Sequence, residues 1–190
     1  MKRTKFIQSL IAFTTLIGTP ISAVAKNLLT PREKGFKVDA GKSRNGKNIS
    51  LFDGDTFFTK ISTKDTNGDL YVFESIRSNE GGPPLHFHYE QDEWWYVLQG
   101  EFLFKVGDET FTAKTGDSVF GPRMIPHAFA KVGQGEAKLL MLFQPAGKME
   151  ENFQAISDGI TAKMTDEERK AFRKKNGFEV VGPALTYLKQ

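Results

Sequence analysis

Cysteine is absent from this 190-residue sequence. The absence excludes disulfide bonds, thiolate metal ligands and a lipid anchor attached through cysteine. A folded domain of this chain must therefore be stabilised by its apolar core. The length is sufficient for one such domain, because a chain of this size buries about 70% of the surface that its unfolded form exposes.

A large excess of either charge is also missing. The formal net charge is +3, from 26 lysine and arginine residues against 23 aspartate and glutamate residues. Lys2, Arg3 and Lys5 lie within the first 25 residues, which contain no acidic residue. Without that segment the numbers of acidic and basic residues are equal. The sequence thus offers no basic surface for nucleic acid, and we expect no nucleic-acid partner.

Long apolar runs are limited to one segment near the start. The stretch from Phe6 to about Ile21 follows a basic beginning and precedes a small-residue segment that ends before Lys26. Polar residues, glycine and proline interrupt it, so it falls short of the roughly 20 apolar residues of a membrane-spanning helix. We interpret residues 1–25 as a cleaved secretory signal peptide, with an uncleaved membrane anchor as the alternative. The mature protein is expected in the periplasm or outside the cell, free of the membrane.

The segment of residues 26–48 is polar and contains several glycines, which predicts an extended N-terminal arm. Within it, residues 35–38 are a candidate for one additional strand. From Ile49 onward, short apolar stretches alternate with turn sequences. We therefore place a β-domain at residues 49–148.

Turn signals recur through this domain. Asn67-Gly68 is typical of a tight turn, and residues 102–106 alternate between apolar and polar side chains up to Gly107-Asp108, a two-residue hairpin connection. Short strands at this spacing predict an all-β sandwich or barrel.

One predicted strand, Ala137–Phe143, is apolar on both faces. A strand of this kind needs cover on both sides of its sheet, so we expect a helix or a partner subunit on one face. A homodimer is the default expectation, because most soluble oligomers are symmetric dimers.

Residues 149–190 have a helical pattern instead. Apolar residues at helical spacing predict a short amphipathic helix at Met149–Ser157. Thr165 and Glu168 match a capping box at the start of a second helix, whose last turn carries the basic run 173–175 beside the negative helix end. We predict a helical tail that is either a structural cap or a lid over the barrel mouth.

Histidine is scarce and concentrated. His86 and His88 lie in the segment GGPPLHFHYEQDEWWYVLQG, which also contains Glu93, and His127 lies in GDSVFGPRMIPHAFA. Because strand side chains alternate, His86 and His88 share one face. Such a pair can be ordinary, partly buried polar residues. Together with Glu93 and His127, however, it favours a site for Fe, Mn, Ni, Cu or Zn, which accept imidazole and carboxylate ligands.

These two segments resemble the paired motifs of the cupin superfamily, over about residues 68–143. The first motif is glycine, a short gap, His-x-His, three or four residues, glutamate, six residues and glycine. The second is glycine, five residues, Pro-x-Gly, two residues, histidine, three residues and asparagine. The resemblance is closest to small single-domain bacterial cupins described as quercetin-dioxygenase-like. The matching residues are Gly81, His86, His88, Glu93, Gly100, Gly116, Pro122 and His127.

Three positions depart from the motifs. Gly81 lies one residue nearer to the histidine pair than in the pattern, Met124 replaces the middle glycine of the second motif, and Lys131 replaces its final asparagine. The first two departures concern turn geometry and the third a strand position. The four ligand positions are unaffected.

The carboxylate ligand has two rivals. Glu90 and Asp92 lie close to Glu93, and Asp92 fits the shorter spacing of the motif. Glu93 has the opposite strand parity to His88, so a turn within residues 89–92 must reorient the chain. The resemblance favours Glu93, which fits the longer spacing and precedes the motif's last glycine by seven positions.

The resemblance implies a single jelly-roll β-barrel with an N-terminal arm and a short C-terminal helical tail. It also implies one divalent transition-metal ion held by His86, His88, Glu93 and His127. Four nitrogen and oxygen ligands leave two open positions on an octahedral ion, which favours Fe, Mn or Ni, with Cu or Zn as alternatives.

Two classes of function stay open. The first is an exported dioxygenase-type oxidoreductase that acts on a small aromatic or phenolic compound with dioxygen, with Glu93 as ligand and proton acceptor. The second is a metal-loaded module that binds a small ligand without catalysis, and cupins with such motifs also include isomerases and decarboxylases. The aromatic residues that support a site for a ring, or that simply fill the core, are Phe73, Phe102, Phe104, Phe120 and Phe129.

Overall fold

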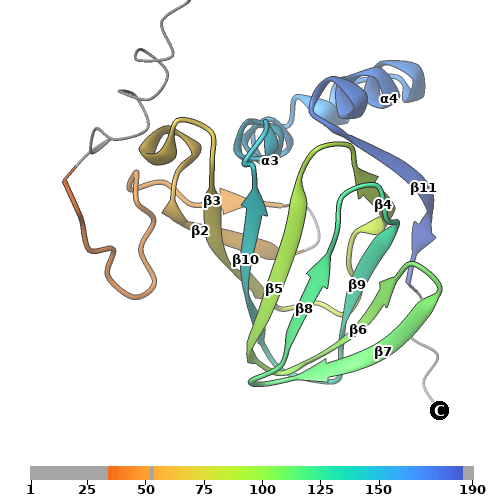
Figure 1. Cartoon of the computed structure of the whole chain (residues 1–190), viewed down its shortest axis with the longest axis horizontal. Helices are drawn as coiled ribbons and strands as arrows, with labels where there is room; N and C mark the ends of the chain where they lie inside the picture. Colours follow the sequence, from red (N-terminus) through yellow and green to blue (C-terminus); the bar gives the residue numbers. More distant parts are fainter. Residues whose placement is uncertain (1–33, 52–53, 186–190) are drawn as a thin grey trace, which may run out of the picture. The chain divides into compact units, whose positions relative to one another are not determined.

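The computed structural model describes residues 34–51 and 54–185, so the expected signal peptide and the start of the arm lie outside the described residues. In the described part, the strands form a six-stranded and a five-stranded antiparallel sheet, accompanied by two α-helices near the end of the chain (Figure 1). This architecture confirms the predicted all-β jelly-roll barrel with a short C-terminal helical segment.

The six-stranded sheet has the order β1-β2-β3-β10-β5-β8. In its central strand β10, Leu139 and Met141 are buried between the sheets, while Leu140 and Leu142 are half-buried on the opposite face, as the sequence pattern predicts. The strands are β1 Ile49–Ser50, β2 Asp55–Ile61, β3 Tyr71–Arg77, β5 Asp92–Gln99, β8 Ser118–Gly121 and β10 Ala137–Gln144.

The five-stranded sheet has the order β11-β4-β9-β6-β7. Its β6–β7 hairpin turns at the predicted Gly107-Asp108, where Gly107 adopts a φ of 58° that glycine tolerates at little cost. The strand that carries the His-x-His pair, β4, lies between β11 and β9. The strands are β4 Pro84–His88, β6 Glu101–Val106, β7 Glu109–Lys114, β9 His127–Val132 and β11 Phe178–Ala184.

Aromatic side chains fill much of the space between the sheets. The rings of Phe57 and Phe73 lie 4.4 Å apart, and those of Trp95 and Phe104 lie 5.4 Å apart. Aromatic side chains bury roughly 150–250 Å² each, so this core provides the apolar burial that a cysteine-free domain requires. Aromatic residues exposed by less than 2% are Tyr71, Phe73, Trp95, Phe102, Phe104 and Phe143.

Both predicted helices are present, at one end of the two sheets (Figure 1). They are α3, Met149–Ser157, and α4, Asp166–Lys175, with the short 3-10 helix η2, Thr161–Lys163, between them. The predicted capping box starts α4: the Glu168 backbone N–H donates to the Thr165 hydroxyl, and the Thr165 N–H donates to the Glu168 carboxylate at 2.8 Å. No residue of α4 is fully buried, so the helix is largely solvated, as expected.

The strand β11 was not predicted. It pairs antiparallel with β4, so that Phe178 lies opposite His88 and Val180 opposite His86. Gly182 and its neighbouring proline weaken the local strand signal, and the pairing depends on an open edge of β4 that no local pattern reveals. The C-terminal segment is therefore part of the barrel wall beside the histidines as well as a helical tail.

The described part of the arm contains turns but no strand at residues 35–38, so the additional strand considered from the sequence does not form. The Arg44 guanidinium lies 4.0 Å from the centre of the Phe36 ring and pairs with Asp65 at 3.2 Å. The predicted turn at Asn67 is present, with a left-handed φ of 53°. Among the described residues, no helix combines the length and apolar character needed to cross a membrane.

Candidate metal centre

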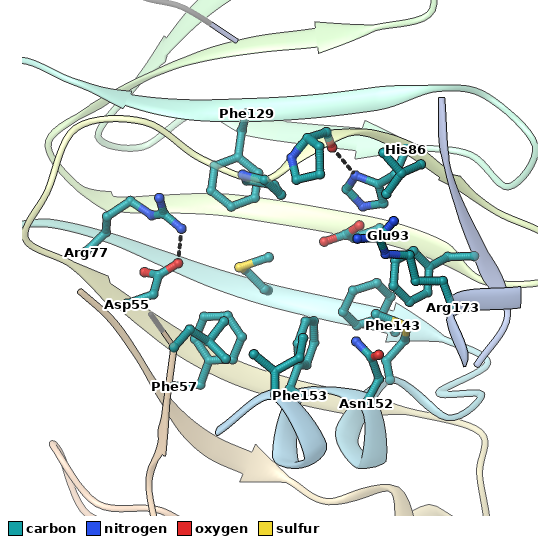
Figure 2. Close-up of a pocket in the computed structure, with 18 residues that line it drawn as sticks. Asp55, Phe57, Arg77, His86, Glu93, Phe129, Phe143, Asn152, Phe153 and Arg173 are labelled. Atoms are coloured by element: carbon teal, nitrogen blue, oxygen red, sulfur yellow. Dashed lines mark hydrogen bonds and ion pairs between the residues drawn. The ribbon is translucent and has the colours of Figure 1, made fainter. Parts of the chain in front are cut away.

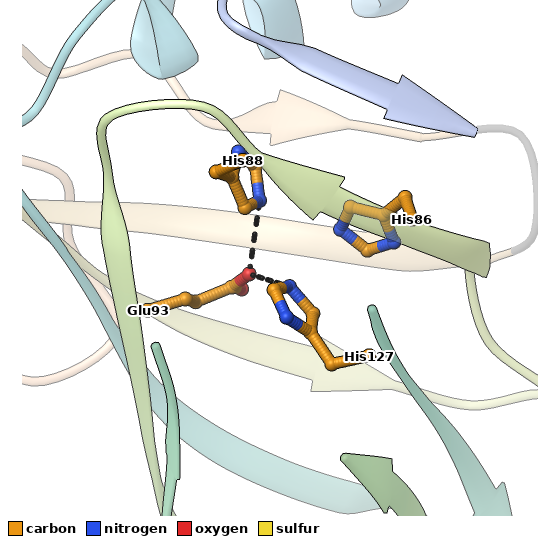
Figure 3. Close-up of side chains that lie close together, drawn as sticks. All are labelled: His86, His88, Glu93 and His127. Atoms are coloured by element: carbon orange, nitrogen blue, oxygen red, sulfur yellow. Dashed lines mark hydrogen bonds and ion pairs between the residues drawn. The ribbon is translucent and has the colours of Figure 1, made fainter. Parts of the chain in front are cut away.

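The four residues singled out from the sequence come together from both sheets (Figure 3). His86 and His88 lie on β4 and His127 begins β9, all in the five-stranded sheet, whereas Glu93 lies on β5 of the six-stranded sheet. One ligand atom from each residue lies within 4.8 Å of the others. The cluster therefore ties the two walls of the barrel together at one point.

A bend between β4 and β5 explains how Glu93 can face His88 although the two residues have opposite parity in an extended strand. The chain leaves the five-stranded sheet after His88 and enters the other sheet at Asp92, which turns the Glu93 side chain back toward the histidines. Gln91, in the bend, is buried against Gly147 and Gly177, where a Cβ atom would lie only 2.2 Å and 2.9 Å from its amide group. Both residues also have positive φ, which glycine adopts readily. Glycine therefore suits these two positions because it has no Cβ atom and because it tolerates this backbone conformation.

The rival carboxylates point elsewhere. Asp92 accepts hydrogen bonds from the Arg123 backbone and from its guanidinium, at 2.6–3.0 Å, and the pair is partly exposed. The Arg123 guanidinium holds the pKa of Asp92 below its usual value. Glu90 is exposed on the bend. Of the three acidic side chains considered, only Glu93 belongs to the cluster.

Two of the imidazoles are oriented by backbone carbonyl groups. The Nδ1 atom of His86 lies 2.8 Å from the Pro84 oxygen, and that of His127 lies 2.9 Å from the Ile125 oxygen. A carbonyl oxygen can only accept, so Nδ1 carries the proton in both rings and Nε2 presents a lone pair. Carbonyl contacts of this kind fix the tautomer of metal-binding histidines.

Glu93 lies between the other ring nitrogens. Its Oε2 atom is 3.1 Å from His127 Nε2 and 3.2 Å from His88 Nε2. Burial acts to raise the pKa of Glu93, but the contacts with His127 and His88 outweigh it and hold the pKa at about 2. Glu93 is therefore an ionised, 2% exposed carboxylate.

The protonation of this cluster fits a cation. The pKa of His86 is lowered to about 3, first by burial and then by the neighbouring His127 and His88. With a proton already on Nδ1, Nε2 of His127 can donate to the Glu93 oxygen only if the ring is charged. In the neutral ring its lone pair faces the anionic oxygen, which is repulsive unless a cation lies between them. In the described part of the chain, the buried Nδ1 of His88 also has no hydrogen-bond partner. A metal ion removes the lone-pair conflict, so the cluster fits a metal site.

Sequence reasoning missed Gly121, at the end of β8. A Cβ atom there would lie 2.7 Å from the Trp95 ring and 3.2 Å from Nδ1 of His127. Trp95 packs edge-on against His127, with ring centroids 5.3 Å apart. The only sequence signal is a glycine inside a strand pattern, which often marks a close approach of this kind.

The departures from the motif have structural outcomes. Met124 adopts a left-handed φ of 65° at the position where the motif has glycine, and its backbone N–H donates to the His88 oxygen at 2.7 Å. Lys131 is 2% exposed and donates from Nζ to the Gly133 oxygen at 2.7 Å. Neither side chain belongs to the cluster, as expected.

A cavity of about 240 Å³ opens beside the cluster, with His86 and Glu93 in its wall (Figure 2). Of the five phenylalanines considered from the sequence, only Phe129 lines it. Phe73, Phe102 and Phe104 are buried core residues, and Phe120 is 56% exposed. The apolar residues that line the cavity are Leu51, Phe57, Pro83, Pro84, Phe129, Met141, Phe143, Met149, Phe153, Ile156, Phe178 and Val180.

Four polar residues in the cavity wall were also not predicted. Asp55 and Arg77 form a buried ion pair, and Arg77 donates to the Gly81 oxygen at 2.9 Å. Asn152 from α3 points into the cavity, and Arg173 from α4 also lines it (Figure 2). In the sequence, the basic run that includes Arg173 indicates only a favourable interaction with the helix end.

Comparisons with known proteins agree with this fold. Residues 68–143 match the family model of the cupin domain. KdgF from Halomonas sp. has a TM-score of 0.50 and 18% identity, covering 60% of this chain and 94% of KdgF. An RmlC-like cupin from Shewanella frigidimarina has a TM-score of 0.51 and 18% identity, covering 62% of this chain and 96% of that protein. At this identity the likeness concerns the fold.

A curated relative is similar over a shorter segment. MJ1618, an uncharacterized protein of Methanocaldococcus jannaschii, is 34% identical over 61 residues, which is 32% of this chain. The match spans about half the length of that protein. The jelly-roll sheets and the His/Glu cluster agree with the family match: residues 68–143 of this chain are similar to a cupin domain.

Proposed function

We propose that this protein is a metal-dependent, dioxygenase-type oxidoreductase that acts on a small aromatic compound. The observation that carries the proposal is that the His86, His88, Glu93 and His127 cluster adjoins a cavity lined by phenyl rings, with His86 and Glu93 in the cavity wall. The ion would be Fe, Mn or Ni, with Cu or Zn as alternatives, because the donor set has three imidazoles and one carboxylate.

An ion held by these residues would supply Lewis acidity and, for a redox-active metal, electron transfer to or from dioxygen. The chain supplies the surroundings. Phe143 and Phe178 pack against the ring of His88, with centroids 5.1 Å and 5.8 Å away, and exclude water on that side. The apolar wall favours a flat, aromatic substrate, since offset and edge-on ring contacts contribute beyond the area they bury.

Glu93 is proposed as a ligand and as the proton acceptor for a substrate hydroxyl. A carboxylate with a pKa of about 2 is a weak base. Proton acceptance would therefore require the loss of its contacts with His88 and His127, which would follow if the Nε2 lone pairs of these rings held the ion. The role of ligand makes no such demand.

The alternative is a protein that holds a small ligand without oxidising it, or a cupin isomerase or decarboxylase. The same cluster and cavity support these functions. Membership of the quercetin-dioxygenase-like subgroup is likewise part of the proposal. The cavity volume of about 240 Å³ is smaller than the roughly 300–1,000 Å³ that is typical of sites for drug-sized ligands. A single-ring substrate fits this size better than a multi-ring one.

Elemental analysis of purified protein, combined with an oxygen electrode and a panel of single-ring phenols, tests the proposal. We expect about one transition-metal ion per chain and dioxygen uptake that is lost after chelation. Stoichiometric metal and tight phenol binding without uptake would instead support the binding function. Absence of a bound transition metal after reconstitution would contradict the metal-dependent function itself.

Export is part of the same proposal and rests on residues 1–25 of the sequence. Intact mass of protein from an exporting bacterial host is expected to correspond to a chain that begins at Lys26, in the periplasm or medium. A full-length chain that stays in the membrane fraction would support the anchor alternative.

A further inference from the structure

Arg173 lies on α4 and is the basic residue of that helix that reaches the metal-site cavity. It is half-buried, and among the residues that the structure describes its side chain forms no hydrogen bond or ion pair. Its neighbour Arg169, one helical turn earlier, instead donates to the Met164 oxygen at 2.9 Å and lies 3.6 Å from Asp166. Asp166 and Glu179 line a neighbouring hollow with Arg173, but neither forms an ion pair with it. A partly desolvated guanidinium without such a pair is costly unless an anion binds there.

The other charged groups around the cavity are engaged with partners other than Arg173. Asp55 and Arg77 neutralise each other within their buried ion pair, and the Glu93 carboxylate faces imidazole nitrogens. Asp55, Arg77, Glu93 and Arg173 are the charged residues in the wall, so their formal charges cancel. A divalent ion at the cluster would raise the net charge of the wall to +2, which favours an anionic occupant.

Asn152 provides a second polar contact at the same end of the cavity. It is 1% exposed, and in the described part of the chain its Oδ1 atom has no hydrogen-bond partner. A hollow of about 490 Å³ between α3, η2 and α4 is also lined by Asn152, Arg173 and Phe178. These three residues, together with Pro84 and Ile156, line both the cavity and the adjoining hollow and form the boundary between them.

We infer that the cavity binds a small aromatic carboxylate whose carboxylate is held by Arg173, with the amide Nδ2 of Asn152 as an additional donor, since a carboxylate only accepts hydrogen bonds. Arg173 matches this group because the planar guanidinium binds a carboxylate through two parallel hydrogen bonds. The aromatic ring would lie among Phe143, Phe153 and Phe178. The inference rests on the proposed function only for the orientation, in which a ring hydroxyl points to the His/Glu cluster.

Calorimetric titration with a matched pair of probes tests this assignment. The probes are 4-hydroxybenzoate and its neutral analogue 4-hydroxybenzamide, with metal-reconstituted protein. Wild-type protein should bind the benzoate more tightly, and Arg173→Gln should weaken benzoate binding by about 10- to 100-fold, as for the loss of a charge-assisted hydrogen bond. Benzamide binding should change little. The control Lys174→Gln removes the same charge from an exposed position of α4 and should keep the preference.

Arg173→Lys covers the case in which Arg173→Gln does not fold. The lysine keeps the charge but loses the bidentate geometry, so an intermediate loss of benzoate affinity is expected. Equal affinity of the wild-type protein for both probes, no binding of either, or equal losses in Arg173→Gln and Lys174→Gln would each overturn the inference.

Repeating the titration with chelated protein separates this inference from the proposed function. Arg173 is not a member of the metal cluster, so some preference for the benzoate should persist without metal. A protein that takes up no metal but keeps an Arg173-dependent preference would contradict the proposed function and support the inference. A metal-loaded protein that oxidises neutral phenols but ignores the carboxylate would do the reverse.

Discussion

His86 and His127 lie directly opposite each other on adjacent strands. They are Cα partners in the β4–β9 ladder, and their ring centroids are 4.7 Å apart at an angle of 71°. Because both side chains stand on the same face of the sheet, the backbone pairing sets the separation of two proposed ligands. The geometry of the proposed metal site therefore depends on the register of β4 and β9, because a shift of one residue would move a histidine to the other face of the sheet.

His127→Ala is expected to remove most of the bound metal, since it deletes one ligand and the described cluster contains no spare histidine. The chain has only three histidines and no cysteine, so no other strong donor can replace it. Elemental analysis after dialysis measures the loss. Val181→Ala, at an exposed position of β11, should retain metal, and a His127→Ala protein with full metal content would contradict the assignment.

Glu93→Gln should retain some metal but lose turnover, because it preserves shape and an oxygen donor while removing the negative charge. Asp92→Asn is its control. That change should leave metal content and turnover near the wild-type level, because Asp92 is bound to Arg123 outside the cluster. Metal loss in Asp92→Asn together with an unaffected Glu93→Gln would reverse the choice of carboxylate.

The metal-free protein should become less stable as the pH falls. The pKa of His86 is lowered to about 3 by burial and by the neighbouring imidazoles of His127 and His88, against 6.5 in an unfolded chain. Between these values the unfolded state binds more protons, so stability falls on acidification by up to about 1.4 kcal/mol per pH unit. Glu93, with a pKa of about 2 against 4.5, adds a loss in the same direction below pH 4.5.

Differential scanning calorimetry in chelator from pH 7.5 to 4 measures this trend. The melting temperature should decrease from about pH 6.5 downward. A flat or rising melting temperature over that interval would show that His86 is not held neutral in the folded protein.

Met124→Gly should stabilise the protein. Met124 has a φ of 65° and is 54% exposed, so it bears left-handed strain with little compensating burial. Such a conformation costs a non-glycine residue about 1–2 kcal/mol, and the greater freedom of glycine in the unfolded chain offsets part of the gain. We expect a net gain of about 0.5–1 kcal/mol in urea unfolding. Ile125→Gly, at the next exposed position, should be destabilising or neutral.

The proposed homodimer would use the outer face of the six-stranded sheet. Leu142 pairs with Val72 on one side and with Trp94 on the other, and Trp94 pairs with Phe120. These four residues form an apolar row across the strands β3, β10, β5 and β8. Phe120→Glu places a charge at the exposed end of this row and should shift a dimer toward monomer in sedimentation equilibrium. Phe111→Glu on β7 of the other sheet is the control. A wild-type protein that is monomeric at all concentrations would contradict the proposal.

Local patterns predicted the fold well where pairing partners are close in the chain. The β6–β7 hairpin, the alternation in Ala137–Phe143 and the capping box at Thr165 all depend on residues within a few positions of one another. The ligand set came from the spacing of His86, His88, Glu93 and His127 together with the family resemblance. The residue types alone left the choice among carboxylates open.

The cavity could not be predicted in the same way. Its wall combines Phe57 from β2, Phe153 from α3 and Phe178 from β11, which meet only after the barrel has closed. Arg173 was hidden in a basic run that suits any helix end. The sequence pattern records which face of an element is apolar, but not which distant element will cover it.

The pairing of β11 with β4 also has a consequence for the order in which the protein matures. The hydroxyl of Tyr89, just after β4, is bonded to Glu179 on β11, 90 positions later in the chain. During synthesis, most of both sheets can form while the His-x-His strand still has one open edge, since domains are made from the N-terminus onward. The pocket beside the His/Glu cluster is therefore among the last parts to close. A ribosome-bound chain that ends before Phe178 should expose the unpaired edge of β4, which carries His86 and His88 and could pair with a strand of another chain.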